Sequence, residues 1–171
     1  ARVGNAEANR ISTQASNRGT SVHKLCEDYC LNLDMDSKAQ PANVEMFKSI
    51  KSELDAHVDN IHSVEGFLYS NFLRVAGQVD LIAEYKGKLS IIDFKTSKKK
   101  KPEKWIQNYF IQESAYAFMY EERTNIKVPQ LVTIIGVDDE PEPQVFVKNA
   151  KERNEYLLEF IKLRETFDLS S

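Results

Sequence analysis

Apolar residues recur at helical spacing near the start of the chain. Between residues 5 and 33 they fall at steps of three and four, from Ile11 to Tyr29, which predicts a helix with a bend near Gly19. Residues 43–61 predict a second amphipathic helix. Its apolar stripe comprises Phe47, Ile50, Leu54, Val58 and Ile61. Two helices with one apolar face each should cover the same face of a sheet.

Strand and helix patterns then alternate along the rest of the chain. They predict strands at 64–70, 76–85, 88–95, 130–137 and 143–147, and helices at 102–124 and 150–167. The tripeptide "KGK" marks a hairpin turn between the second and third strands, and the acidic "DDEPEP" marks a turn between the last two. This order predicts an α/β fold with a mixed central β-sheet flanked by helices.

Composition limits the class of protein. With 171 residues, 42% hydrophobic and 29% charged, the chain is expected to form a single domain over 1–171. A net charge of −3 argues against a generally basic nucleic-acid coat, but it leaves room for a local basic patch. No apolar run reaches the roughly 20 residues that cross a bilayer, so no membrane partner is expected. The chain starts at Ala1 without an initiator Met, which leaves an upstream extension open.

The two cysteines, Cys26 and Cys30, are too few for a disulfide framework. We therefore expect an intracellular, reducing setting, in which both cysteines are packing residues. A cluster held by four cysteines is excluded by the same count.

Charged residues stand at the end of an apolar strand in "IIDFKTSKKKK", residues 91–101. Alternation places Asp93 and Lys95 on one face, about 7 Å apart along the strand. Counting back through the hairpin turn puts Asp80 nearly opposite Asp93. Two facing carboxylates are destabilising unless a cation joins them, and oxygen ligands favour Mg²⁺ or Mn²⁺.

Each part of this pattern has an ordinary explanation when it stands alone. An Asp-x-Lys sequence is usually an exposed strand end, and Asp80 alone fits a turn or an edge position. The combination on two adjacent strands is more specific, because two acids and a lysine together can bind a metal and hold a water molecule beside a phosphodiester.

Four segments in this order resemble motifs of the PD-(D/E)XK nucleases, in particular the RecB-like branch. They are "RGTSVHKLCEDY", "VAGQVDLIA", "IIDFKTS" and "QESAY", and together they extend over most of the chain. The resemblance implies a restriction-endonuclease-like core. It also implies a metal-dependent nuclease.

Carried over position by position, the resemblance implies that His23, Asp80, Asp93 and the backbone carbonyl of Phe94 bind the metal. Lys95 would contact the attacking water or the scissile phosphate. Without the resemblance, a lone helical histidine is more often a structural residue. The implied cofactor is Mg²⁺ or Mn²⁺, with no iron–sulfur cluster, because iron–sulfur members of the branch carry four cysteines that this chain lacks.

Four further residues are candidates for supporting roles. Glu27, one helical turn after the histidine, and Glu65, at the start of the first strand, could contact the metal ligands from outside. A solvated helix carboxylate is the alternative for Glu27. The resemblance implies that Gln112 and Tyr116, one turn apart, contact the substrate backbone or brace the catalytic lysine. Without it, Tyr116 would be a core residue and Gln112 a surface residue.

Basic and polar residues near the third strand are candidates for binding DNA. A run such as Lys98 to Lys101 is usually a solvated loop, but this one leaves the strand that carries the Asp-x-Lys pair. The further candidates are Arg18, Thr96 and Ser97. One of Trp105, Tyr109 and Phe110 could stack on a base, although most residues at this spacing should be core.

The sequence therefore predicts a metal-dependent DNA exonuclease. From the resemblance we expect it to act on single-stranded DNA with a free end, in replication, recombination or repair, alongside other replication or recombination proteins. Three alternatives stay open: a structure-selective endonuclease, a catalytically idle nucleic-acid-binding module, and a recruitment domain of a larger machine.

Overall fold

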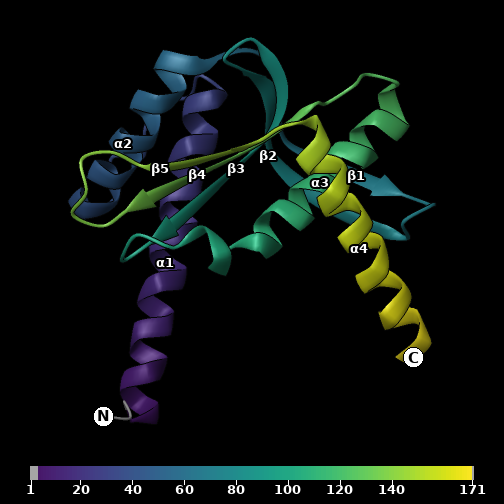
Figure 1. The fold of residues 1–171 in the computed structure, drawn as a ribbon. Coiled ribbons are helices and arrows are strands. Elements are labelled where there is room, and N and C mark those ends of the chain that lie inside the picture. Colours follow the sequence, from purple (N-terminus) through teal and green to yellow (C-terminus); the bar gives the residue numbers. More distant parts are fainter. Residues whose placement is uncertain (1–3, 171) are drawn as a thin grey trace.

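A five-stranded mixed sheet forms the centre of the computed structural model, which describes residues 4–170 (Figure 1). The strands are β1 (Val58–Ser70), β2 (Val75–Tyr85), β3 (Lys88–Ser97), β4 (Gln130–Val137) and β5 (Gln144–Lys148). They lie in chain order across the sheet, and β3 and β4 are parallel while the other neighbours are antiparallel. A parallel pair requires a crossover connection, which here is a helix.

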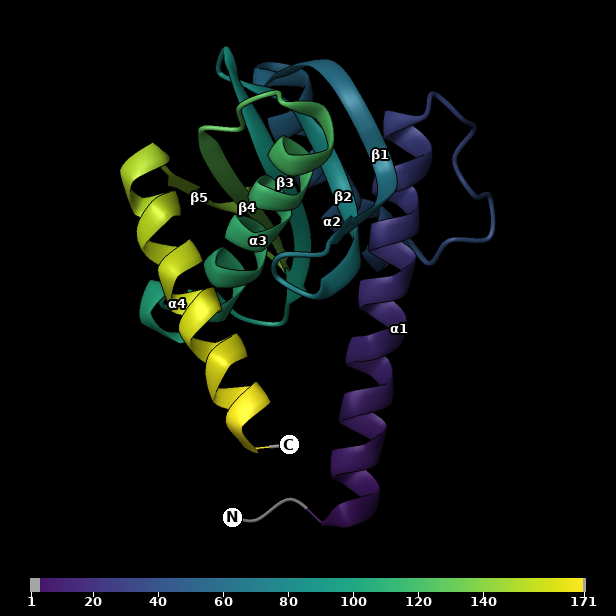
Figure 2. The same ribbon diagram turned by 90° about the vertical axis from the view of Figure 1, so that its right-hand side faces the viewer.

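Four helices cover the two faces of this sheet. They are α1 (Asn5–Cys30), α2 (Pro41–His57), α3 (Gln107–Thr124) and α4 (Ala150–Ser170), with a short 3₁₀ turn, η1 (Glu103–Trp105), before α3. Helices α1 and α2 lie on one face, whereas α3 makes the crossover on the other face and α4 packs on α3 (Figures 1 and 2). The predicted α/β class is confirmed. Among the residues described, no helix combines the length and the apolar character needed to span a membrane.

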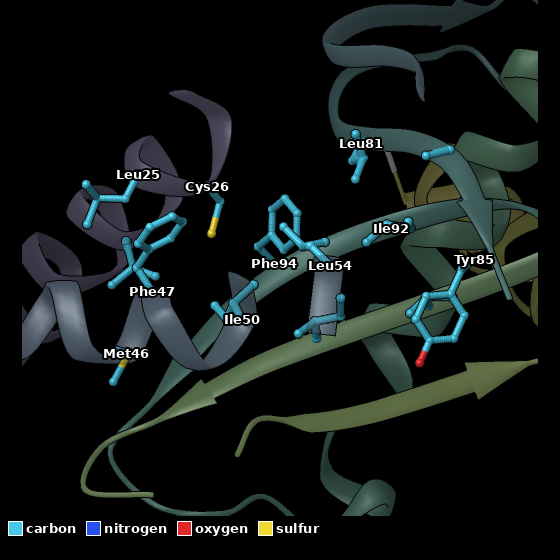
Figure 3. Close-up of a cluster of buried hydrophobic side chains, with 14 residues drawn as sticks. Leu25, Cys26, Met46, Phe47, Ile50, Leu54, Leu81, Tyr85, Ile92 and Phe94 are labelled. Atoms are coloured by element: carbon cyan, nitrogen blue, oxygen red, sulfur yellow. The ribbon is translucent and has the colours of Figure 1, made fainter. Parts of the chain in front are cut away.

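The larger core lies between the sheet and the two N-terminal helices (Figure 3). Phe47 and Ile50 of α2 and Cys26 of α1 pack against Ile92 and Phe94 of β3, and all five side chains are buried. The prediction that both helices cover one sheet face is therefore confirmed. This packing fixes β3 against α1, which is the contact that the site depends on.

The turn between β2 and β3 sets the register of the central hairpin. Lys86 and Gly87 both have positive φ, 49° and 80°, as expected for the two central residues of a type I′ turn. Pairing runs from Tyr85 opposite Lys88 to Leu81 opposite Ile92, and the same register continued by one step places Asp80 opposite Asp93. The aspartates thus lie just beyond the last paired residues.

Two predicted element boundaries are wrong. The predicted second helix extends to residue 61, but α2 ends at His57, and both Val58 and Ile61 belong to β1. Their apolar spacing fits either structure, and pairing with β2 decides for the strand. The predicted third helix begins with Pro102, whereas α3 begins at Gln107 after the separate turn η1. Helix α1 continues through Gly19 as one element.

Candidate active site

Asp80 joins three elements at the open end of the central hairpin. Its Oδ2 accepts a hydrogen bond from the backbone N–H of Phe94 at 2.8 Å, which ties β2 to β3 beyond their last paired residues. Its Oδ1 lies 2.6 Å from Nε2 of His23 on α1. The carboxylate is therefore fixed from two sides, and its orientation is set by the docking of α1 on the sheet.

Glu65 completes a three-residue cluster with these two. Its Oε1 lies 2.9 Å from Nε2 of His23, and one ligand atom from each of His23, Glu65 and Asp80 lies within 4.8 Å of the others. The β1–β2 register pairs Gly66 with Val79 and so places Glu65 opposite Asp80. Glu65 also has a positive φ of 52°, a local irregularity of β1 at the site.

The environment of this cluster raises the pKa of both His23 and Glu65, so it favours the protonated form of each. The hydrogen bond to Asp80 raises the pKa of His23 to about 9, despite partial burial, which lowers it. Burial raises the pKa of Glu65 to about 7, and the nearby Asp80 charge adds to this effect. The proton on His23 Nε2 therefore stands between two carboxylates, where a cation is electrostatically favoured.

Asp93 and Lys95 form the second half of the site, on the α3 side of β3. Lys95 Nζ lies 2.9 Å from Asp93 Oδ2, so the predicted shared face of these two residues is confirmed. Burial, together with repulsion from Asp80, raises the pKa of Asp93 to about 7. Burial lowers the pKa of Lys95, but attraction from Asp93 outweighs it, and the net shift is upward.

The donor set fits a hard divalent cation. Asp93 Oδ2 is buried, and although Lys95 lies close to it, this oxygen makes no hydrogen bond of good geometry within the described residues. A buried carboxylate oxygen without a well-aligned hydrogen bond is costly, and a metal ion would satisfy it together with the Lys95 ion pair. Carboxylate oxygens with one imidazole suit Mg²⁺ or Mn²⁺. Glu65, expected only as an outer contact, belongs to the inner cluster by its distances.

Glu113 of α3 is a carboxylate near the site that the sequence reasoning missed. It is 1% exposed, and both of its oxygens lie within hydrogen-bond reach of Thr133 Oγ1, at 2.8 and 2.9 Å. Burial and the nearby Asp93 charge raise its pKa well above the usual range. The sequence pattern could have pointed to Glu113, because it lies between Phe110 and Ala117 on the buried stripe of a helix, where a carboxylate is unusual.

Several predicted DNA-binding residues lie around the site. Thr96 lines an open hollow of about 400 Å³ together with Gly19, His23 and Lys95. Gln112 Nε2 donates to Tyr116 Oη at 3.2 Å, so the predicted pair on one side of α3 is in contact. Lys98 and Lys99 are exposed. Ser97 is buried, and its hydroxyl bonds within the turn to the backbone of Lys99.

Other candidates lie apart from the acids or have other partners. Arg18 lines a separate hollow with Asn17 and Asp36. Glu27 is half-buried, and its ion pair is with Lys24 at 3.9 Å. Among the aromatic candidates, Trp105 is 71% exposed, Phe110 is fully buried, and Tyr109 is half-buried next to two lysines.

Most of the chain matches the sequence model of a known family. The sequence model of the PD-(D/E)XK nuclease superfamily matches residues 35–168, a range that excludes the whole of α1 and therefore His23. Mitochondrial genome maintenance exonuclease 1 of Xenopus tropicalis is 30% identical over 127 residues, which are 71% of this chain and 36% of that protein. This chain thus spans about a third of the length of that relative.

The fold also resembles that of a solved structure. It is the crystal structure of a protein of Eubacterium rectale that has been proposed to be an exonuclease. The TM-score is 0.57 at 13% identity, over 87% of this chain and 64% of the other. At this identity the likeness concerns the fold alone.

We expect the metal-free protein to lose stability as the pH rises. Asp93 and Glu65, each with a folded pKa of about 7, hold protons more tightly when folded, so stability falls as the pH rises from their unfolded values through 7. His23 contributes stability that is complete below its unfolded pKa and is lost as the pH rises through about 9. Each group protonated only in the folded state contributes a slope of about 1.4 kcal/mol per pH unit.

The measurement is denaturant unfolding after metal removal, at about pH 5, 7 and 9. Asp93→Asn should flatten the slope in the lower interval, whereas Asp34→Asn, at an exposed position, should leave it unchanged. A free energy of unfolding that stays constant or rises over this range would contradict the assigned shifts.

Proposed function

The chain belongs to the PD-(D/E)XK nuclease superfamily, and on that premise we propose that it is a Mg²⁺- or Mn²⁺-dependent deoxyribonuclease. The observation that carries this proposal is the convergence of His23, Glu65, Asp80, Asp93 and Lys95 at one end of the β2–β3 hairpin. Three acids, an imidazole and an ammonium group meet there, and two of these residues, His23 and Lys95, also line an open hollow. This set can hold a cation and a phosphate oxygen together.

In this proposal the metal ligands are the side chains of Asp80, Asp93, Glu65 and His23, with the backbone carbonyl of Phe94 as predicted from the resemblance. The bound metal would supply Lewis acidity at the scissile phosphate and lower the pKa of a water molecule. Asp80 is held rigidly by the Phe94 N–H, so its orientation does not depend on the metal. His23 must release its Nε2 proton to become a ligand, which couples metal affinity to pH.

Lys95 is the proposed electrostatic catalyst. Its ammonium group remains charged, because the attraction of Asp93 raises its pKa. With 30% of its side chain exposed, it can donate to a water molecule or to a phosphate oxygen in the hollow. Charge that develops on the phosphoryl oxygens would be stabilised by this fixed cation.

The proposed substrate is single-stranded DNA with a free end, and the proposed setting is DNA replication, recombination or repair. Two observations support this choice. The relative from Xenopus tropicalis is named an exonuclease, and the exposed Lys98 and Lys99 follow directly from the strand that carries Lys95. A flexible strand passing these lysines would bring its phosphates to the site.

We expect Lys95→Ala to abolish most cleavage without unfolding the protein. Loss of about 3 kcal/mol of transition-state stabilisation slows a reaction by about two orders of magnitude. The assay is the initial rate of DNA cleavage with Mg²⁺ or Mn²⁺, with an EDTA arm that should show none. Lys88→Ala, at an exposed position on the same strand, is the matched control and should keep the wild-type rate. Full activity of folded Lys95→Ala, or robust cleavage in excess EDTA, would reject the mechanism.

We expect linear single strands to be degraded faster than linear duplexes, and closed circular single strands to resist. An exonuclease must engage an end, whereas an endonuclease has no such requirement. Initial rates on the three substrates, at equal nucleotide concentration and low salt, separate the two activities. The Lys95→Ala protein reports any contaminating nuclease. Circles that are cut as fast as linear strands would identify an endonuclease, and no cleavage of any DNA would favour a binding or recruitment domain.

We expect the double change Lys98→Gln and Lys99→Gln to weaken DNA binding and flatten its salt dependence. Each lost phosphate contact removes a slope of about 0.7 from log K against log salt for single strands. The matched control is Lys86→Gln with Lys88→Gln, two exposed lysines at the opposite end of β3. Turnover at saturating DNA should survive in both proteins. Equal salt slopes in the two double variants would show that Lys98 and Lys99 are a solvated loop.

A further inference from the structure

Two lysines contact different parts of Tyr109 beside the site, Lys95 its ring and Lys101 its hydroxyl. Tyr109 lies in the first turn of α3, and Lys95 Nζ lies 5.0 Å from its ring centroid. Lys101 Nζ donates a hydrogen bond to the Tyr109 hydroxyl at 3.1 Å, which places it beside the edge of the ring. An ammonium group within about 6 Å of an aromatic ring is attracted by the electron density of its face.

The Tyr109 ring can hold the Lys95 ammonium group in position without neutralising its charge. A lysine side chain is flexible, and holding it in one position costs conformational entropy. The second described contact of its ammonium group is the carboxylate of Asp93, at 2.9 Å. A metal ion on Asp93 would compete for that carboxylate and weaken the ion pair. The Tyr109 ring is uncharged, so it can keep the ammonium group in place without neutralising it or competing for a metal.

The backbone of Lys101 is anchored to β5, whereas the backbone of Lys99 bonds within its own turn, to the Ser97 hydroxyl. Its N–H donates to Gln144 Oε1 at 2.8 Å, and its carbonyl accepts from Gln144 Nε2 at 3.1 Å. This reciprocal pair fixes the end of the lysine run to β5. The hydroxyl of Tyr109 then holds the Lys101 ammonium group beside the edge of the ring that Lys95 contacts.

We propose that Tyr109 is a positioning residue with two separable parts. Its ring holds Lys95 in place for the phosphodiester reaction, and its hydroxyl holds Lys101 as the contact for a neighbouring phosphate of the strand. This inference rests on the proposed nuclease function. It assigns a separate role to each part of Tyr109: the ring affects turnover, and the hydroxyl affects substrate binding.

Tyr109 also packs against a small core cluster, so the experiment must distinguish its proposed positioning role from a purely structural role. The cluster contains Ile106 and Phe110, and Tyr156 of α4 packs against it as well. Tyr156 hydrogen-bonds Gln107 and contacts the Phe110 ring. It is therefore the matched control: Tyr156→Leu removes a comparable ring from the same cluster.

The experiment measures kcat, KM and the melting temperature with Mn²⁺ and a linear single-stranded DNA. Tyr109→Leu should lower kcat about tenfold, the equivalent of one cation–π contact. Tyr109→Phe keeps the ring and should restore kcat to within about twofold of wild type, while KM rises severalfold, as it should in Lys101→Gln. Tyr156→Leu should leave kcat unchanged. If Tyr109→Leu fails to fold, Tyr109→Met takes its place, because it fills space without a ring.

A double-variant cycle decides whether Tyr109 acts through Lys95. In the Lys95→Ala background, Tyr109→Leu should cause no further loss of kcat, because the ammonium group that the ring positions is gone, while KM should still rise because the hydroxyl that holds Lys101 is lost. Equal and additive losses in both backgrounds, or an equal loss of kcat in Tyr156→Leu, would overturn the inference. A wild-type protein that cuts no DNA would instead refute the proposed function. A wild-type protein that cuts DNA as fast as Tyr109→Leu would refute this inference alone.

Discussion

The burial of like charges at the open end of the β2–β3 hairpin is the constraint on which the rest of the structure depends. Asp80 and Asp93 lie just beyond the last paired residues, and Glu65 approaches from β1. Such a group is stable only if cations and hydrogen-bond donors reach it from several sides. His23 reaches it from α1, Lys95 from β3, and the Phe94 N–H from within the hairpin. Groups from both faces of the sheet therefore offset the negative charge of the carboxylates at this point.

The two faces contribute in different ways. The face under α1 and α2 is an apolar core, and its close packing determines where the His23 ring lies. The face under α3 combines apolar packing with polar contacts, including the Glu113–Thr133 hydrogen bonds and the Tyr109 ring. The site needs both the His23 ring, which the first face holds in position, and the charged side chains on the second face. Neither face alone contains all of its residues.

Much of this arrangement could be predicted because it depends on local periodicity and a short count. Alternation along β3 put Asp93 beside Lys95, and the two-residue turn placed Asp80 opposite Asp93. Contacts that depend on tertiary packing were harder. Glu65 points into the site because of the register between β1 and β2, which depends on the whole length of β1. The start of β1 was predicted wrongly, because the spacing of Val58 and Ile61 fits a helix equally well. For Arg18 the helix was predicted correctly, but the sequence did not reveal that its side chain lines a hollow apart from the site.

The irregular backbone of β1 has a consequence for the behaviour of the protein in a crowded solution. β1 is an edge strand of 13 residues, and a long, regular edge invites pairing with strands of other molecules. Its register shifts between Asp59 and Ser63, and Asn60 and Glu65 both have positive φ. These irregularities bend the edge and misalign its free N–H and C=O groups. The local geometry beside the proposed metal ligands therefore also disfavours edge-to-edge pairing with other molecules, so a change that straightened β1 would risk solubility together with the proposed activity.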